Sequence, residues 1–353
     1  MIQTKIIRID PQNPDNDILR EAGSLIEQGG LVIIPTETVY GVAANMLDEY
    51  AVARLSELKS RPKDKPYTIH IAEKHKVEDL AKRIPLAAYK LMNKFWPGPL
   101  TIVLLAIRGG TIGIRMPDDK IALEVIKYSG VPVICPSANI SGKNAPKSFS
   151  DAIADFEGKV DIAIDSGDTR LGVESTVVDL SKESFQVLRE GAIKESEISK
   201  AISTKEILFI CTGNSCRSVM AEALLKKIIK EKNRDDVIVS SAGIMMLSGL
   251  GVSQGTKEVL AKEGIDFSNH RSQRVSAEMI RKSDLILVME KIHEDAILRL
   301  APEVKNRVFL LKEFAKIKGN RLDIPDPIGK SLEFYEQTFA AIKEAVERIS
   351  NLI

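Results

Sequence analysis

Short apolar runs that end in polar loops recur along the first 200 residues, and helical patterns separate them. A helix is expected after Asp15, because Ile18, Ala22 and Ile26 fall on one face, and Gly29 with Gly30 should end it. The expected strands cover residues 31–34, 67–72, 101–107, 112–117, 161–165, 175–180 and 185–188, with a strand-to-loop junction at 131–139. This order predicts an α/β fold with a mixed, twisted sheet.

A second alternation begins at Ile207 and predicts a different sheet. The expected strands cover residues 207–210, 237–243, 284–289 and 308–311, and a long amphipathic helix follows with Phe334, Ile342, Val346 and Ile349 on one face. Strands that alternate with helices predict a doubly wound, parallel, four-stranded sheet. We therefore expect two domains, residues 1–203 and 204–353, joined by the helix-prone, charged segment 192–204.

Composition narrows the class of protein. A chain of 353 residues with 44% hydrophobic content exceeds the usual size of one domain. Lys and Arg number 50 against 49 for Asp and Glu, so charge alone does not argue for duplex binding. The first residues lack the long apolar segment of a secretory signal, and the apolar run at 102–107 is far too short to cross a membrane. Three cysteines favour a reducing, cytoplasmic location, and no metal-ligand spacing is found.

Polar side chains concentrate where the strands of the first domain should end. In open α/β sheets such loops line the ligand crevice, and several cations that converge there suit a polyanion such as a triphosphate. Taken alone, the turn KSRPKDKP at 59–66 is better explained as a solvated, proline-stiffened loop. The residues concerned are Thr36, Lys59, Arg61, Lys63, His70, Arg115, Ser137, Asn139, Ser175 and Arg189.

The motifs PTETVYG, FWPGPL, IRMP, PSAN and GVESTVVDL occur in this order, and the set resembles the YrdC-like threonylcarbamoyl-AMP synthases over nearly all of residues 1–200. The resemblance implies that L-threonine, bicarbonate and ATP form threonylcarbamoyl-AMP and pyrophosphate, with Mg²⁺ on the phosphates. The product would feed a tRNA threonylcarbamoyl-transfer complex that makes the t6A modification. Some relatives favour an alternative, a module that only binds nucleotide, double-stranded RNA or tRNA.

The same resemblance assigns roles to single residues. Nucleotide binding falls to Lys59, Arg61, Lys63, Thr111, Ser137, Asn139 and Arg189. Threonine binding falls to Thr36, His70, Arg115 and Ser175, with the backbone of Cys135. The segment REG at 189–191 lacks a proline that many relatives have between the arginine and the glycine. Longer relatives also carry a C-terminal domain of another kind, which is replaced here.

The stretch ILFICTGNSCRS, residues 207–218, places Cys211 after a buried strand and before a helix. Unpaired N–H groups and the helix dipole make such a loop an anion site, although a lone cysteine is more often a small buried hydrophobe. Together with Asp326-Pro327 downstream, the unit resembles the low-molecular-weight protein phosphatases across residues 205–353.

That second resemblance implies a covalent mechanism on a phosphoprotein substrate. Cys211 is the nucleophile, Arg217 binds the phosphoryl oxygens, Ser218 hydrogen-bonds the thiolate and Asp326 is the general acid and base. The phosphate loop comprises Thr212, Gly213, Asn214, Ser215 and Cys216; Asn214 fixes its backbone, and Cys216 is placed to form a reversible disulfide with Cys211.

Two positions bear on the substrate of this domain. Tyrosine-specific relatives usually have a bulky aliphatic residue at Ser215 and an aromatic residue at Ile328, whereas protein-arginine phosphatases have threonine at the first position. We therefore favour phosphoarginine over phosphotyrosine. Val219 stands where proline is usual, a change of little consequence. An arsenate reductase on this fold needs further cysteines, and none follows Cys216.

Overall fold

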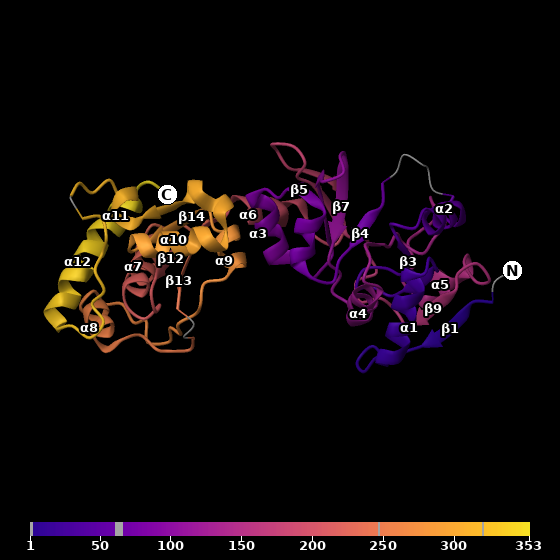
Figure 1. Ribbon diagram of the computed structural model, residues 1–353, viewed down its shortest axis with the longest axis horizontal. Helices are drawn as coiled ribbons and strands as arrows, with labels where there is room; N and C mark the ends of the chain where they lie inside the picture. Colours follow the sequence, from indigo (N-terminus) through magenta and orange to yellow (C-terminus); the bar gives the residue numbers. More distant parts are fainter. Residues whose placement is uncertain (1–2, 61–65, 246–247, 320) are drawn as a thin grey trace. The chain divides into compact units, whose positions relative to one another are not determined.

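The computed structural model describes residues 3–60, 66–245, 248–319 and 321–353. The chain divides into two compact units, residues 1–202 and 203–353 (Figure 1). Each unit has its own sheet and its own apolar clusters, so each is described by itself.

Among the described residues of the first unit, 11 strands form one mixed sheet. Its order is β1-β9-β2-β3-β8-β4-β7-β6-β10-β11, with β5 paired to β6. Pairs such as β4 with β7 are parallel and pairs such as β6 with β7 are antiparallel, which confirms the predicted mixed sheet. The strands are β1 Lys5–Arg8, β2 Val32–Ile34, β3 Gly41–Asn45, β4 Thr68–His70, β5 Ala81–Arg83, β6 Leu100–Ala106, β7 Thr111–Arg115, β8 Val133–Ile134, β9 Ile162–Asp165, β10 Thr176–Asp179 and β11 Gln186–Arg189.

Helices cover both faces of this sheet. The buried strand β2 shows why: Val32 and Ile34 pack with α1 and α4, while Leu31 and Ile33 belong to the cluster that includes α2 and α3. As predicted, α1 begins after Asp15, whose side chain accepts the N–H of Asp17. The helices are α1 Asn16–Glu27, α2 Glu49–Leu58, α3 Leu86–Phe95, α4 Lys120–Ser129, α5 Phe149–Ala154 and α6 Glu195–Ser203, with the short 3₁₀ turn η1 Lys74–Asp79.

The second unit contains a four-stranded sheet in the order β13-β12-β14-β15, and all its pairs are parallel. The predicted parallel sheet is thus confirmed. Its strands are β12 Lys205–Cys211, β13 Val237–Gly243, β14 Leu285–Val288 and β15 Val308–Leu310. Its helices are α7 Arg217–Glu231, α8 Gln254–Lys262, α9 Ala277–Lys282, α10 Lys291–Leu300, α11 Leu311–Phe314 and α12 Leu332–Ile349, with the 3₁₀ turn η2 Pro302–Arg307.

The central strand β12 is buried on both faces, because successive side chains point to opposite sides of a strand. Phe209 and Cys211 join the cluster formed with α7, α8 and α12. Leu208 and Ile210 join the cluster formed with α9 and α10. The strand therefore ends in a rigid core and holds Cys211 at its carboxyl end.

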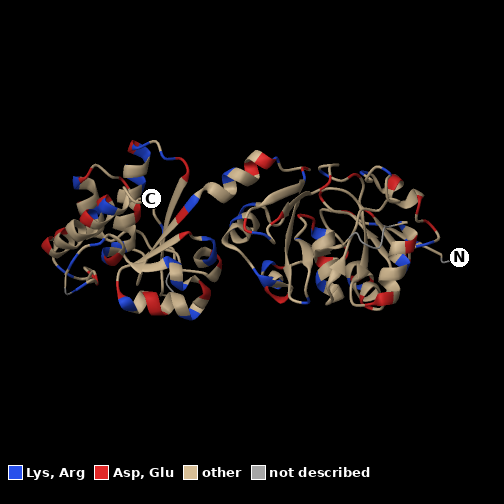
Figure 2. Cartoon of the chain, turned by 90° about the horizontal axis from the view of Figure 1, so that it is seen from above, with Lys and Arg blue, Asp and Glu red and all other residues tan. Residues whose placement is uncertain are grey.

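Two surface properties bear on function. No helix in the described part of the chain is long and apolar enough to cross a membrane. Basic and acidic residues are interspersed over the elements of each unit (Figure 2). This pattern agrees with the neutral charge balance of the sequence.

Candidate functional sites

The first unit contains a cavity of about 510 Å³ at the ends of several strands. It is lined by residues of the loop after β2, the strands β4, β6 and β7, and the segments around β8, β10 and β11. The fold thus brings together eight of the residues singled out in the sequence: Thr36, His70, Thr111, Arg115, Cys135, Ser137, Ser175 and Arg189.

Arg115 is a fixed cation in the wall of this cavity. Its Nη2 donates to Thr38 Oγ1 at 2.8 Å and lies 2.8 Å from Glu37 Oε1. Both charged side chains are almost fully buried. The Nε–H group of Arg115 has no hydrogen-bond partner among the described residues. Since a buried donor without a partner costs free energy, this group is available to an anionic ligand.

His70 ends strand β4 and is buried beside Arg115. Burial, and then the cation of Arg115, lower the pKa of His70 to about 3. The imidazole is therefore neutral at physiological pH. Its Nδ1 atom lacks a hydrogen-bond partner within the described parts of the chain. His70 thus offers a neutral polar group to the cavity beside the cationic Arg115.

Thr36 and Cys135 are two further residues of the cavity. Thr36 Oγ1 donates to the carbonyl of Val39 at 2.6 Å, which orders the turn before β3. Cys135 is buried, and burial raises the pKa of its thiol to about 12. The thiol of Cys135 therefore stays protonated at physiological pH.

Arg189 is anchored to the strand that carries Ser175. Its Nε donates to the Ser175 carbonyl at 3.0 Å and its Nη2 to Ser175 Oγ at 3.2 Å, and Glu174 pairs with its Nη1. Gly191 has no room for a side chain, because a Cβ there would lie 2.2 Å from the Glu174 carbonyl oxygen. Arg189 lines the cavity although the segment REG lacks the proline.

Lys59 reaches the same region from the end of α2. Its buried ammonium group donates to the Ser137 carbonyl and, at 2.6 Å, to the Asn139 carbonyl. Lys59 and Asn139 are not among the residues that line the cavity itself, so the lysine also fixes the loop that presents Ser137. The candidates Arg61 and Lys63 lie outside the described residues.

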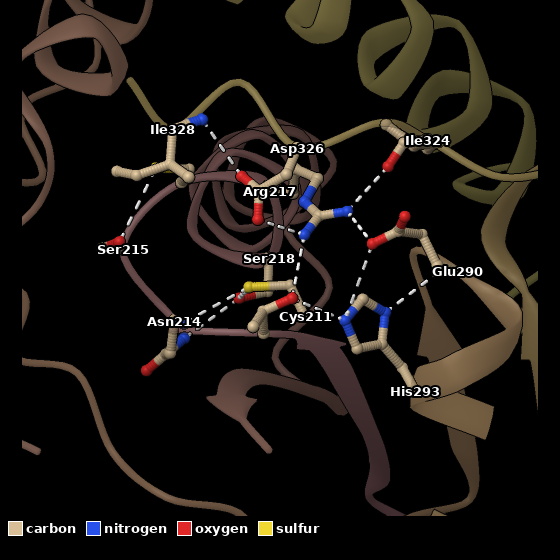
Figure 3. A network of polar contacts seen from close by, with 12 residues as sticks. Cys211, Asn214, Ser215, Arg217, Ser218, Glu290, His293, Ile324, Asp326 and Ile328 are labelled. Atoms are coloured by element: carbon tan, nitrogen blue, oxygen red, sulfur yellow. Dashed lines mark hydrogen bonds and ion pairs between the residues drawn. The ribbon is translucent and has the colours of Figure 1, made fainter. Parts of the chain in front are cut away.

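In the second unit, the loop after β12 encloses the sulfur of Cys211 (Figure 3). Cys211 Sγ lies 3.0 Å from Ser218 Oγ and accepts the backbone N–H of Asn214 at 3.3 Å. The Asn214 amide donates to both Ser218 Oγ and Ser241 Oγ. Because Ser218 Oγ accepts from that amide, its own hydrogen is free to point at the sulfur. Asn214 has a φ of 53°, and its side chain holds this turn through hydrogen bonds with Ser218, Ser241 and the backbone N–H of Gln273.

Arg217 lies beside the sulfur and is buried, with 1% of its side chain exposed. Its Nη2 donates to Asp326 Oδ2 at 2.5 Å, and its Nη1 donates to the Ile324 carbonyl and pairs with Glu290 (Figure 3). Its Nε–H has no partner among the described residues. The fold thus unites Cys211, Arg217, Ser218 and Asp326 from two segments more than 100 residues apart.

His293 and Glu290 belong to this site, and the motifs gave no sign of them. His293 Nε2 lies 2.9 Å from Thr212 Oγ1, and the side chain is fully buried. Burial, and then the cation of Arg217, lower the pKa of His293 to about 4. The one available signal was position, since both residues follow the predicted strand 284–289. Glu37 in the first unit was not predicted either. It lies in the motif PTETVYG, in which only Thr36 was expected to bind a ligand.

The remaining loop residues are also in place. Cys216 Sγ donates to Ser253 Oγ at 3.1 Å, and Cys211 and Cys216 are both free thiols. Ser215 accepts the N–H of Ser253 through its carbonyl, and the side chain of Ile328 is 56% exposed. Gly243, beside the loop, has no room for a side chain, because a Cβ would lie 2.7 Å from the Thr212 carbonyl oxygen and 3.0 Å from a backbone atom of Gly213.

Comparison with known proteins finds a different family for each unit. The Sua5_yciO_yrdC family model, described as "Telomere recombination", matches residues 24–191. The model described as "Low molecular weight phosphotyrosine protein phosphatase" matches residues 206–352.

Individual relatives agree for the first unit. A threonylcarbamoyl-AMP synthase of Pyrococcus abyssi is 46% identical over 215 residues, which cover 58% of this chain and 63% of the relative; the chain thus spans about three fifths of that protein. A putative threonylcarbamoyl-AMP synthase of Methanocaldococcus jannaschii is 35% identical, over 56% of this chain and 99% of the relative. A crystal structure of P. abyssi Sua5 complexed with L-threonine is 27% identical, with a TM-score of 0.55 and coverage of 98% of each chain.

Proposed function

Because this chain belongs to the Sua5/YciO/YrdC family through its first unit and carries a low-molecular-weight phosphatase domain in its second, we propose that it is a fusion of two enzymes. The first unit forms threonylcarbamoyl-AMP and pyrophosphate from L-threonine, bicarbonate and ATP. The second unit hydrolyses phosphorylated proteins through a cysteinyl-phosphate.

The cavity around Arg115 supports the first activity. Arg115 and His70 present polar groups without partners in the described residues, next to hydroxyl groups of Thr36 and Ser175. Such a set suits the carboxylate and hydroxyl of threonine. The complex of the P. abyssi relative with L-threonine supports the same ligand class.

The nucleotide is proposed to lie toward Ser137, Thr111 and Arg189, which line the same cavity. Lys59 and Asn139 would support it from the loop behind, and Arg61 and Lys63 complete the proposed set. Described residues offer no group of three or more His, Cys, Asp or Glu side chains for a metal. Mg²⁺ bound together with the nucleotide would neutralise the charge of the phosphate oxygens.

The chemistry then requires positioning more than proton transfer. An oxygen of the threonine-derived carbamate attacks the α-phosphorus of ATP, the bond to the β-phosphate oxygen breaks, and pyrophosphate leaves. Arg115 and His70 hold the carbamate in line, and the cations stabilise the negative charge that builds up. The product is an activated threonylcarbamoyl group, which a tRNA-modifying complex would consume.

Pyrophosphate release by the whole chain tests the first activity. We expect release only when L-threonine, bicarbonate and ATP are all present, and threonylcarbamoyl-AMP should be detected by mass spectrometry. ATP turnover that ignores threonine would instead support a module that only binds nucleotide or RNA.

For the second unit, the arrangement around Cys211 gives the mechanism. The thiolate attacks phosphorus, the bond to the leaving group breaks, and Asp326 donates a proton to that group. Water then attacks the cysteinyl-phosphate while Asp326 accepts its proton, and phosphate leaves. Arg217 binds phosphoryl oxygens, and the Ser218 hydroxyl stabilises the sulfur anion in both steps.

We further propose phosphoarginine as the preferred substrate. Ser215 presents a small hydroxyl side chain, and an isoleucine stands at position 328 after Asp326-Pro327. A polar group there suits a guanidinium better than a phenyl ring. Hydrolysis of a phosphoarginine peptide against a phosphotyrosine peptide of matched sequence tests this choice. Preference for phosphotyrosine would overturn it and leave the phosphatase activity standing.

A further inference from the structure

A series of hydrogen bonds connects the start of α10 to Arg217, and the mechanism proposed above gives it no role. The backbone N–H of Glu290 donates to His293 Nδ1 at 3.0 Å. His293 Nε2 lies 2.9 Å from Thr212 Oγ1, and Arg217 Nη2 donates to the same oxygen at 3.1 Å. His293 and Arg217 are both buried, so water does not compete for these contacts.

The direction of these hydrogen bonds follows from the donors. A backbone N–H can only donate, so His293 Nδ1 is the acceptor and the neutral imidazole carries its hydrogen on Nε2. His293 therefore donates to Thr212 Oγ1, and Arg217 donates to it as well. Two accepted hydrogen bonds occupy both lone pairs of this hydroxyl oxygen. What is left to Thr212 is its own hydrogen, which it can only donate.

We propose that His293 is a positioning residue that fixes the Thr212 hydroxyl as a hydrogen-bond donor to the phosphoryl group. This inference rests on the phosphatase function proposed above. Both N–H groups of Arg217 Nη2 are taken, by Thr212 Oγ1 and Asp326 Oδ2, and the Nε–H, which has no partner among the described residues, is left for a phosphoryl oxygen. Thr212 Oγ1 lies 3.1 Å from Nη2 of the same guanidinium, so its hydroxyl hydrogen is on the side where that phosphoryl oxygen would bind. The phosphoryl oxygens remain negative through the transfer, and a donor oriented in advance stabilises them without reorganisation.

Glu290 makes the arrangement rigid. Its backbone orients His293, and its carboxylate pairs with Arg217 Nη1. The beginning of α10 thus fixes the guanidinium and the threonine hydroxyl relative to each other. A leucine or valine at position 212 would leave one N–H group of His293 and one N–H group of Arg217 without a hydrogen-bond acceptor. This cost explains why a polar residue stands at this point of the loop.

The test is a double-mutant cycle on the full chain with p-nitrophenyl phosphate. Thr212→Val and His293→Ala should each lower kcat/KM about 10- to 100-fold, mainly through kcat, the effect of one lost hydrogen bond to a charged group. The double variant should be no slower than the slower single variant, because both changes remove the same donor. His75→Ala is a matched control, since His75 is exposed in the first unit.

Two conservative variants sharpen the result. Thr212→Ser keeps the hydroxyl and should stay within about 3-fold of the unchanged chain. His293→Gln keeps an N–H donor near Nε2 and should recover most of the activity lost in His293→Ala. Thr212→Val should also weaken inhibition by vanadate more than inhibition by inorganic phosphate, because vanadate mimics the transition state.

Four further results would each have a defined meaning. Effects of Thr212→Val and His293→Ala that multiply in the double variant would show that His293 does not act through Thr212. Full activity of Thr212→Val would remove the donor role. If His293→Ala does not fold, the comparison of Thr212→Val with Thr212→Ser still tests the hydroxyl donor. The activity of His293→Gln then tests the role of His293. Absence of Cys211-dependent hydrolysis in the unchanged chain would instead overturn the proposed phosphatase function.

Discussion

The two candidate sites both lie at strand ends, but they are assembled in opposite ways. The cavity of the first unit takes its residues from separate segments between Thr36 and Arg189, and each segment contributes one or two groups. The site of the second unit takes the nucleophile and its loop from residues 211–218, and Asp326, Glu290 and His293 close it. A distributed site positions several substrates, whereas a continuous loop surrounds one phosphoryl group. The two sites should therefore respond differently to the loss of one residue.

The largest expected effect is at the nucleophile. Cys211→Ser should lower phosphatase activity about 1000-fold or more, because the covalent step is lost. Threonine-dependent pyrophosphate release by the same preparation should be unchanged. Assay of both activities on one protein sample makes the comparison direct. Substantial remaining hydrolysis would contradict the covalent mechanism, and a fall in both activities would contradict two independent sites.

A smaller, mixed effect is expected at Arg115. Arg115→Met removes the cation of the proposed threonine site and leaves the buried Glu37 carboxylate without its ion pair. The KM for threonine should rise about 100-fold, and the unit should lose about 3 kcal/mol of stability. Threonine titration and chemical denaturation measure the two effects. Arg108→Met, an exposed change in the neighbouring hairpin, is the control and should leave both unchanged.

Ser215→Ile should change specificity with little effect on folding. The larger apolar side chain favours a phenyl ring over a guanidinium group, so the ratio of phosphotyrosine to phosphoarginine hydrolysis should rise about 10-fold. Rates on the two matched peptides give this ratio. A ratio that stays constant would place the determinant elsewhere, and Ile328→Phe is the next variant to compare.

The last expected effect concerns the pH dependence of the stability of the first unit. The pKa of His70 is lowered to about 3 in the folded chain, so below pH 6.5 the unfolded chain binds a proton that the folded chain does not bind. The free energy of unfolding therefore falls as the pH drops from 6.5 to 3. Asp119 opposes this: burial, and then the charge of Glu37, raise its pKa to about 6, so the folded state gains stability as pH drops from 6 to 4.

Asp119→Asn keeps a side chain able to cap α4 and removes the opposing titration. This variant should therefore lose about 1–3 kcal/mol more than the unchanged chain between pH 6 and 4. The chain has one tryptophan, Trp96, buried in the first unit, so its fluorescence follows the unfolding of that unit. An unchanged pH slope would show that Asp119 is ionised in the folded state.

The sequence predicted the second unit more fully than the first, for a physical reason. Each strand of the parallel sheet contains at least three consecutive apolar residues, and the phosphate loop is one continuous motif. In the first unit, β3 (GVAAN) is built from small residues buried on both faces, and β1 is an edge strand with mostly exposed side chains. Neither shows the alternation or apolar run that marks a strand. The helices α3 and α4 were not predicted either.

The partners of the site residues were the least predictable part. Glu37, Glu290 and His293 matter because of what the fold places beside them, namely Arg115, Arg217 and Thr212. Their separation in sequence reaches 81 residues for the pair of His293 and Thr212. No local pattern carries that information. The ordered motifs revealed which side chains gather, and the coordinates revealed which of them neutralise or orient the others.

Gly243 bears on how the phosphatase loop tolerates change. It sits at the end of β13 against the backbone of residues 212–214, where even one methyl group would collide. Gly243→Ala would displace the loop backbone at residues 212–214, which includes the Asn214 N–H that donates to the sulfur of Cys211. No reacting group is altered by this substitution. Inactivating changes in this half of the protein therefore need not touch any residue capable of chemistry, and a survey limited to polar positions would overlook them.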